Sequence, residues 1–186
     1  VSVLTADSPA GPWRDPLGHG LITRDVPNCA NVLWLFDPAV FVDNDGTGYL
    51  FFGGGVPEGM QADPGTIRCV QLGEDMISLA CEPQTVHAPY VFEDSGINKV
   101  GDNYIYSYCT NWNVDAAGTA EYGFTNANIA YMVSDDPMGP FTYAGVALKH
   151  PGSYFAGDYS NNHHAIFEFN GEWYITYHTR ILADDY

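Results

Sequence analysis

The chain has 186 residues, and its 6 basic and 23 acidic side chains give a formal net charge of −17 at pH 7. A surface of this charge repels phosphate backbones and anionic lipid headgroups, which excludes nucleic acid and membranes as partners and disfavours a polyanionic substrate. Aromatic residues make up 15% of the sequence, with 20 glycines and 12 prolines, a composition typical of an all-β protein of short strands and tight turns.

The first element in chain order is a turn motif that occurs twice. Residues 7–13 and 135–141 both read Asp-x-Pro-x-Gly-Pro-aromatic, and a glycine and a short apolar tail follow each copy. Proline lacks a backbone donor and glycine weakens helices and strands. We therefore interpret both copies as bends that join one strand to the next.

Three later stretches repeat another pattern. Residues 37–53, 93–108 and 163–178 each begin with an ionisable residue, continue as a short alternating run, pass through a turn of Gly, Asp or Asn, and end in an aromatic-rich run. Apolar runs on either side of such a turn predict a β-hairpin. The first residues of the three hairpins are Asp37, Glu93 and His163.

These hairpins begin at intervals of 56 and 70 residues, which indicates a radial array of sheets. We predict a β-propeller, in which the innermost strand of each blade lines one central channel. Blades of this length leave room for about three in the chain. Because Asp37, Glu93 and His163 occupy the same position in successive hairpins, they are expected to point into one small volume.

The cysteines and the N-terminus leave the cellular compartment open. Cys29, Cys69, Cys81 and Cys109 contain no Cys-x-x-Cys pair and no zinc-like spacing, so two disulfides and four buried thiols are both compatible with the pattern. The sequence starts at Val1 without the basic and apolar regions of a signal peptide, as expected if such a segment was removed or the start is missing. Secreted and cytoplasmic locations are both retained, with secretion favoured.

Four segments, in order, resemble glycoside hydrolase family 43. They are residues 35–55 around Asp37, residues 92–108 around Glu93, residues 134–141, and residues 161–180, which together extend over nearly the whole chain. The family comprises five-bladed β-propellers that include β-xylosidases, α-L-arabinofuranosidases and arabinanases. The resemblance therefore implies a five-bladed propeller, about three blades of which are present in this sequence.

The resemblance also implies catalytic roles. Glu93 matches the general acid of the family, and Asp37 matches the aspartate that tunes and orients that acid. The pairing is physically coherent, because a carboxyl group that donates a proton near neutral pH needs a raised pKa, which burial and a neighbouring negative charge supply. Glu82 and Asp94 are the rival donors if the alignment is shifted.

The third acid of the family, the general base, has no match. In the family it lies upstream of the segment that resembles residues 6–13, and only five residues precede that segment here. Asp7, Asp15 and Asp25 lie in the turn motif or in the connection after it and are poor substitutes. We expect residues 1–186 to be a single propeller catalytic domain, incomplete at both ends, that alone is nearly inactive and self-associates through unpaired strand edges.

Sugar sites combine flat aromatic faces with a few fixed hydrogen-bond donors. Four aromatic residues near expected strand starts and loops are candidate substrate contacts: Trp34, Phe36, Trp112 and Phe155.

Two basic residues complete the predicted site. Arg180 matches an arginine that reaches the active site in the family, where it could pair with the acids. His163 matches a histidine that faces the centre of the channel, close to a calcium ion or a water cluster. Calcium prefers oxygen ligands, so a metal at His163 and a histidine bonded to channel water both stay open.

The sequence thus predicts an inverting glycoside hydrolase that cleaves arabinofuranosyl or xylosyl linkages in plant hemicellulose. Its substrate would be a polysaccharide or oligosaccharide such as arabinoxylan, arabinan or a xylo-oligosaccharide. Glu93 would protonate the leaving oxygen while water attacks the opposite face of the sugar, and no cofactor is required. The alternative is a non-catalytic sugar-binding or structural propeller module, which an assay on nitrophenyl glycosides would distinguish.

Overall fold

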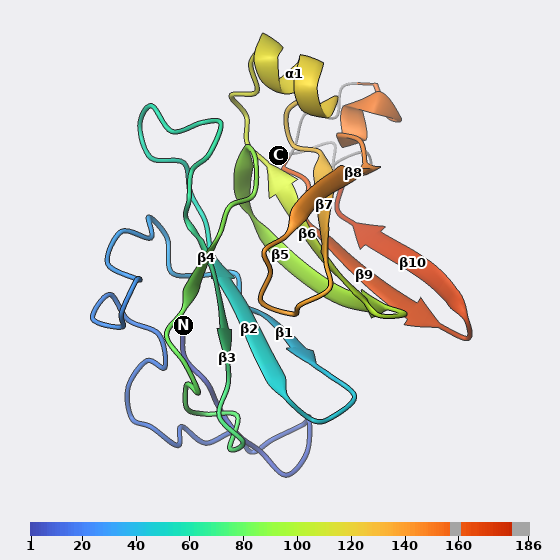
Figure 1. Ribbon diagram of the computed structural model, residues 1–186. Coiled ribbons are helices and arrows are strands. Elements are labelled where there is room, and N and C mark those ends of the chain that lie inside the picture. The colour runs from blue at the N-terminus through green and yellow to red at the C-terminus, as the bar shows by residue number, and fades with distance from the viewer. Residues whose placement is uncertain (157–160, 180–186) are drawn as a thin grey trace.

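The computed structural model describes residues 1–156 and 161–179, and Figure 1 shows that sheets dominate its regular structure. The first sheet is an antiparallel meander in sequence order: β1 (Ala39–Val42), β2 (Gly48–Gly53), β3 (Ile67–Gln71) and β4 (Gln84–Val86). The second has the same order: β5 (Val91–Val100), β6 (Asn103–Thr110), β7 (Ile129–Ser134) and β8 (Thr142–Leu148). Strands β9 (His164–Phe169) and β10 (Glu172–Tyr177) form the third.

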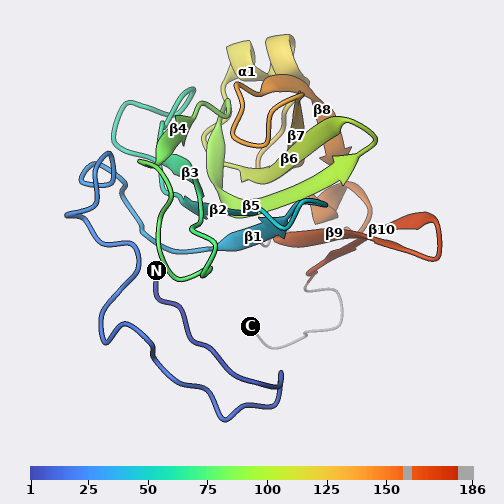
Figure 2. The same ribbon diagram turned by 60° about the horizontal axis from the view of Figure 1, so that its bottom comes forward.

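These sheets correspond to the three predicted hairpins. Each begins with a predicted hairpin, formed by β1–β2, β5–β6 and β9–β10. The first strand of the second sheet, β5, contacts the first strands of the other two sheets, β1 and β9. Figure 2 shows these three strands side by side where the sheets converge. They are therefore the inner strands of three adjacent blades.

The core lies mainly between the first two sheets. Phe51 of β2 stacks on Tyr106 of β6 with ring centroids 5.4 Å apart, and Tyr106 stacks in turn on Tyr108. The opposite face of the first sheet is also buried, because Leu50, Phe52 and Val70 pack against Ile22 and Cys29 of the N-terminal segment. Since β2 is covered on both faces, its sequence is almost continuously apolar instead of alternating.

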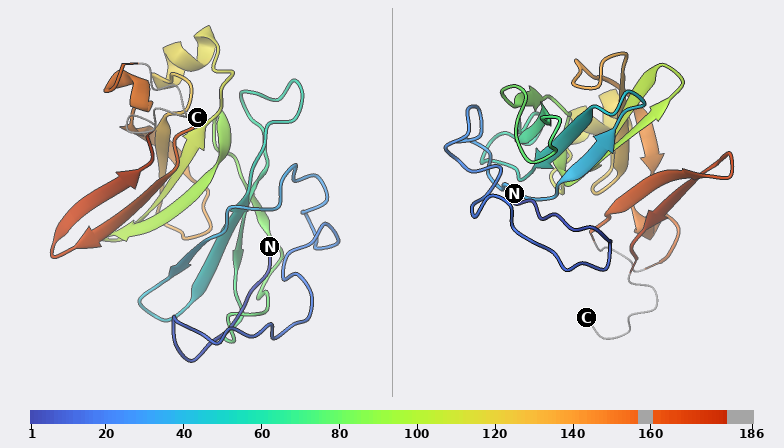
Figure 3. Two further views of the ribbon diagram at one scale, coloured as in Figure 1. Left: turned by 180° about the vertical axis from the view of Figure 1, so that it is seen from behind. Right: turned by 90° about the horizontal axis from the view of Figure 1, so that it is seen from below.

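The N-terminal segment and the only helical turns lie at opposite ends of the described part of the molecule (Figure 3). The short helix α1 (Ala116–Tyr122) was not predicted, because seven residues are too few to show a helical period. It is defined by its caps instead: the Asp115 carboxylate accepts the Gly118 amide, and Gly123 ends the helix with a left-handed φ of 72°. A 3₁₀ turn, η1 (Pro151–Ser153), precedes β9.

Both copies of the proline-glycine motif form turns, as predicted. The second copy joins β7 to β8, and the first lies between Thr5 and Arg14, which form an isolated antiparallel bridge. The motif therefore contributes to topology and not to the site.

An ionic contact joins the hairpin turn of the first blade to the second blade. The Asp43 carboxylate accepts hydrogen bonds from Lys99 Nζ at 2.7 Å and from the Tyr104 hydroxyl at 2.5 Å. These two hydrogen bonds lower the pKa of Asp43 to about 2. Asp43 thus has a packing role at the hairpin turn.

The four cysteines are free thiols, which excludes the two-disulfide alternative. Cys29, Cys69 and Cys109 are buried, whereas Cys81 is exposed. Within residues 1–156 and 161–179, no helix is long and apolar enough to cross a membrane.

Candidate active site

The three residues that begin the hairpins converge, as predicted. Asp37 lies two residues before β1, Glu93 is the third residue of β5, and His163 directly precedes β9. One carboxylate oxygen of each acid and one ring nitrogen of His163 all lie within 4.8 Å of one another. Residues separated by more than 50 positions thus meet because each lies at or near the start of an inner strand.

Glu93 is the centre of this cluster and is 6% exposed. Its Oε1 accepts a hydrogen bond from Asn161 Nδ2 at 2.6 Å and lies 2.5 Å from His163 Nε2. In the part of the chain that the structure describes, Oε2 of Glu93 has no hydrogen-bond partner. The carboxyl group is therefore held through one oxygen and leaves the other available.

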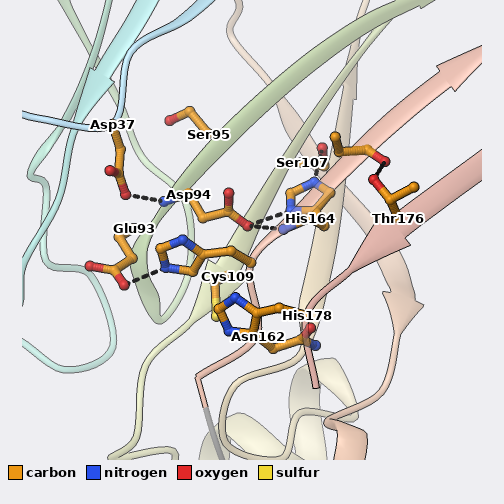
Figure 4. A network of polar contacts seen from close by, with 12 residues as sticks. Asp37, Glu93, Asp94, Ser95, Ser107, Cys109, Asn162, His164, Thr176 and His178 are labelled. Atoms are coloured by element: carbon orange, nitrogen blue, oxygen red, sulfur yellow. Dashed lines mark hydrogen bonds and ion pairs between the residues drawn. The ribbon is translucent and has the colours of Figure 1, made fainter. Parts of the chain in front are cut away.

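A β-bulge directs Glu93 and its neighbour Asp94 to different partners. The register of β5 against β6 shifts on both sides of Glu93, and Asp94 has a left-handed φ of 68°. Such a bulge bends the strand and re-aims its side chains. Figure 4 shows the result: Glu93 and Asp37 lie together, while the Asp94 side chain points away from them toward His164. The Asp94 amide donates to Oδ2 of Asp37 at 3.3 Å, which links the two blades.

The charges in the cluster act on one another. Burial raises the pKa of Asp37, and the negative charge of Glu93 raises it further. The hydrogen bond to Glu93 raises the pKa of His163, an effect that partial burial opposes. The cluster therefore favours binding of protons by Asp37 and His163, as expected where two carboxyl groups share one small volume.

Two of the predicted aromatic residues lie beside the acids. Trp34 packs edge-on against Phe36 and against Phe92, the residue before Glu93, with ring centroids 5.5 Å apart in both pairs. A Cβ atom on Gly54 would come within 2.8 Å of the Phe36 ring and 3.2 Å of Glu93 Cβ, so Phe36 and Glu93 share one glycine-lined space. Trp34 is 41% exposed and leaves an aromatic face accessible.

The other predicted contacts lie elsewhere or outside the described residues. Trp112 packs against a small core cluster and lies edge-on to His150, with ring centroids 5.6 Å apart. Phe155 is half-buried after η1 and contacts Tyr154. Arg180 lies outside the described residues. Contact of these three residues with substrate stays a prediction.

The rival acids have other partners or positions. Glu82 is exposed before β4, and Asp94 is bound to His164. Asp7, Asp15 and Asp25 are exposed in the N-terminal segment, where the Asp15 carboxylate accepts the amides of the next turn. Glu93 is thus the acid that the geometry favours.

Two residues of the site were not named from the sequence. Asn161 contacts Glu93, and His178 stacks on His163 with ring centroids 5.3 Å apart. Both could have been inferred from residue spacing in the sequence. Alternation places Asn161 on the same side as His163, and the register from the Asn170-Gly171 turn places His178 opposite His163. A surface depression of ≈320 Å³ lies along His163 and His178.

The cluster fits a directly bound calcium ion poorly at His163. Its Nε2 is already in contact with Glu93 and Asn161, and the Glu93 contact favours the protonated ring, which cannot coordinate a cation. Calcium takes six to eight oxygen ligands, so the two carboxylates of the cluster would leave a large part of its coordination shell to water.

Comparison with known proteins is consistent with this site. The model of the family described as glycosyl hydrolases family 43 matches residues 1–186. An arabinoxylan arabinofuranohydrolase of Paenibacillus polymyxa is 52% identical, over 98% of this chain and 29% of the relative. Its counterpart in Bacillus subtilis (strain 168) is 50% identical, over 98% of this chain and 36% of the relative. The chain thus spans about a third of the length of these curated relatives.

Solved structures give the same result. The crystal structure of a glycoside hydrolase family 43 arabinoxylan arabinofuranohydrolase from Bacillus subtilis, in complex with cellotetraose, matches with a TM-score of 0.88 at 49% identity, over 98% of this chain and 38% of that one. An α-L-arabinofuranosidase from Clostridium thermocellum matches with a TM-score of 0.77 at 39% identity, over 98% of this chain and 54% of that one. These neighbours are five-bladed β-propellers, which confirms the predicted fold class.

Proposed function

Because the chain belongs to glycosyl hydrolases family 43, we propose that its protein hydrolyses arabinofuranosyl or xylosyl linkages of hemicellulose, with Glu93 as the general acid. The observation that carries this proposal is the convergence of Asp37, Glu93 and His163 from three blades to within 4.8 Å. The relatives named for arabinoxylan and arabinofuranoside support an arabinoxylan-type polysaccharide as the substrate. The acidic surface agrees with a neutral glycan.

Glu93 acts by donating a proton to the leaving oxygen. Oε1 is held by Asn161 and His163, so Oε2 is the oxygen that faces the glycosidic bond and carries the proton. His163 lies 2.5 Å from Oε1, where it orients the carboxyl group. Fixed orientation matters because acid catalysis requires the donor within hydrogen-bond reach of the leaving group.

Asp37 orients Glu93 electrostatically and does not activate water. In an inverting pair the acid and base carboxyl groups lie roughly 6.5–9.5 Å apart, which leaves room for the attacking water. Asp37 and Glu93 have oxygens within 4.8 Å of each other, too close for that arrangement. We therefore assign the base of the inverting reaction to a third carboxylate and keep Asp37 as the tuning residue.

The accessible face of Trp34 is proposed as a sugar contact. The Trp34 ring packs against Phe92, the residue before Glu93, so a sugar stacked on Trp34 would have its glycosidic bond near the acid. Flat aromatic faces suit the C–H surface of a pyranose or furanose ring.

Calcium has no step in this mechanism. A calcium ion in the channel stays a proposal, which rests on the carboxylates of Asp37 and Glu93. Proton transfer from Glu93, tuned by Asp37, uses protein carboxyl groups alone.

The test is a Glu93→Gln variant of the full-length protein. Glutamine keeps the size of the side chain but cannot donate a proton from Oε2. General acid catalysis contributes about 10²–10⁴-fold, so activity on arabinoxylan should fall by that factor. Activity on nitrophenyl arabinofuranoside or xyloside should fall far less, because an activated leaving group needs little protonation. Glu82→Gln, at the exposed rival acid, is the matched control and should retain activity.

Three outcomes distinguish the alternatives. Equal losses of activity on both substrate classes would contradict the role of Glu93. Binding of arabinoxylan without turnover by the unmodified protein would favour the non-catalytic module. The anomer of the sugar released first, read by proton NMR, tests the stereochemistry. Retention would make Asp37 a nucleophile, since retaining carboxyl groups lie only about 5–5.5 Å apart.

A further inference from the structure

Three side chains, of which those of Ser107 and His164 are fully buried and that of Asp94 is 12% exposed, form a continuous chain of contacts behind the cluster. Oδ2 of Asp94 lies 2.5 Å from His164 Nδ1 and also accepts the His164 amide at 2.8 Å. On the other side of the ring, His164 Nε2 lies 2.7 Å from Ser107 Oγ. Figure 4 shows this sequence from Asp94 through His164 to Ser107. It joins the inner strands β5 and β9 to β6.

This Asp–His–Ser order is that of a nucleophilic triad, but its burial excludes that chemistry. Ser107 is 0% exposed, and the His164 side chain is also 0% exposed. A substrate carbonyl cannot reach Ser107 Oγ. The contacts must therefore act on the surrounding structure.

The backbone is built to admit these contacts. Gly96 of β5 pairs with Ser107 of β6, and a Cβ atom on it would come within 2.6 Å of Ser107 Oγ and 3.1 Å of His164 Nε2. A larger residue at position 96 would therefore displace the serine or the ring. Asp94 adopts its left-handed φ of 68° in the bulge that also directs Glu93. A non-glycine residue holds such a conformation only where its surroundings enforce it.

Asp94 is connected to every member of the catalytic cluster. Its amide donates to Asp37, its peptide neighbour is Glu93, and its side chain holds the residue next to His163. Two successive acids on β5 thus pair with two successive histidines at the start of β9: Glu93 with His163, directly before the strand, and Asp94 with His164, its first residue. Only the first pair lies in the catalytic cluster.

We propose that Asp94, His164 and Ser107 are positioning residues that lock the bulge of β5 against β9 and so set the orientation of Glu93 relative to Asp37 and His163. This inference rests on the proposed function for its kinetic consequence. Nδ1 of His164 faces a carboxylate and therefore donates there, while Nε2 is hydrogen-bonded to the Ser107 hydroxyl. Removing that hydroxyl leaves the ring unsupported on one side. A misplacement of about 1 Å in a catalytic group costs about 10²-fold in rate, so a partial shift should cost roughly tenfold.

The kinetic test compares Ser107→Ala and Asp94→Asn with Ser134→Ala in the full-length protein. Ser134 is a matched control, because it is 6% exposed in β7 and its hydroxyl accepts one backbone amide, from Asp136. Ser107→Ala and Asp94→Asn should lower kcat on arabinoxylan roughly tenfold with little change in KM, and lower kcat on nitrophenyl arabinofuranoside much less. Ser134→Ala should leave both activities unchanged even if its melting temperature falls equally.

A second measurement reports the geometry directly. The proton between Glu93 and His163 should give a downfield resonance in proton NMR of the unmodified protein, assigned by its loss in Glu93→Gln. Ser107→Ala should move that resonance, and Ser134→Ala should not. An unmoved resonance, or equal losses on both substrates that follow melting temperature in all three variants, would overturn the positioning role. If the unmodified protein hydrolyses neither substrate, the proposed function fails, and the NMR comparison alone decides whether the contacts set the position of Glu93.

Discussion

The contact between Asp43 and Lys99 predicts how much one contact between two blades contributes to the stability of the protein, independently of its catalytic activity. Asp43 and Lys99 side chains are only 10% and 23% exposed, and they join the hairpin turn of the first blade to β5 of the second. Asp43→Asn keeps the shape of the side chain and a carbonyl oxygen for Tyr104 but removes the negative charge. Activity should be unaffected, because Asp43 and the catalytic residue Asp37 lie at opposite ends of β1.

The magnitude follows from the pKa of Asp43. Hydrogen bonds from Lys99 and Tyr104 lower that pKa from 3.8 to about 2. At about 1.4 kcal/mol per pH unit, the contact stabilises the folded protein by at most about 2.5 kcal/mol at pH 7. Solvent screening reduces such values, so we expect Asp43→Asn to lower the free energy of unfolding by about 1 kcal/mol. For a domain of 150–250 residues this corresponds to a melting temperature lower by about 2–4 °C.

The pH dependence has a definite sign. A carboxyl group whose pKa is lowered in the folded state stabilises the protein above its unfolded pKa, and this contribution disappears as pH falls through the folded pKa. The difference in unfolding free energy between the unmodified protein and Asp43→Asn should therefore be full above pH 4 and shrink toward pH 2.

Urea denaturation at pH 7 and at intervals down to pH 2.5 measures this difference. Asp45→Asn, at an exposed position of the same turn with no cationic partner among the described residues, is the control and should have a smaller effect. Identical stabilities of Asp43→Asn and the unmodified protein at pH 7, or a difference that persists unchanged at the lowest pH, would refute the reasoning.

Two further predictions concern the catalytic cluster. Asp37→Asn should lower kcat on arabinoxylan by at least about tenfold, with no loss of stability in thermal melts at pH 7. Asparagine tolerates the left-handed φ of 48° at this position. Burial and Glu93 raise the pKa of Asp37, so its ionisation opposes folding above its folded pKa, and removing the charge does not destabilise the protein. Rescue of this variant by azide, with formation of a glycosyl azide, would instead identify Asp37 as a nucleophile. Dialysis against a chelator should leave kcat within about twofold, since the acid-catalysed step is assigned to Glu93 alone, and a larger loss restored by Ca²⁺ would place a metal in the mechanism.

Much of the architecture could be predicted from the sequence because propeller blades repeat locally. Alternating runs on either side of glycine-rich turns determine the hairpins, and a hairpin is stabilised by residues close in sequence. The repeat position of Asp37, Glu93 and His163 then predicted their convergence without any distance information. Strand alternation and hairpin register could also have identified Asn161 and His178 as residues of the site.

The sequence alone could not predict the directions of Glu93 and Asp94. Strict alternation places two successive residues on opposite faces of a strand, but it does not predict the bulge at which β5 bends or the partner of each side chain. The contacts of His164 with Asp94 and with Ser107 join residues that are 70 and 57 positions apart in the sequence. Only the packing of three strands together shows that His164 is part of a polar network instead of an apolar core.

The same distinction applies to the aromatic residues. Trp34 and Trp112 look equivalent in sequence, each beside a strand that leads to or from the site. In the folded chain Trp34 is 41% exposed beside Phe92, whereas Trp112 is half-buried against the cluster of Cys109, Ala127 and Ile129. The sequence determined the strands, their order and the residues at their heads, because these depend on local periodicity. The tertiary structure decided which side chains share a partner, because burial and contact depend on strands that are adjacent only in space.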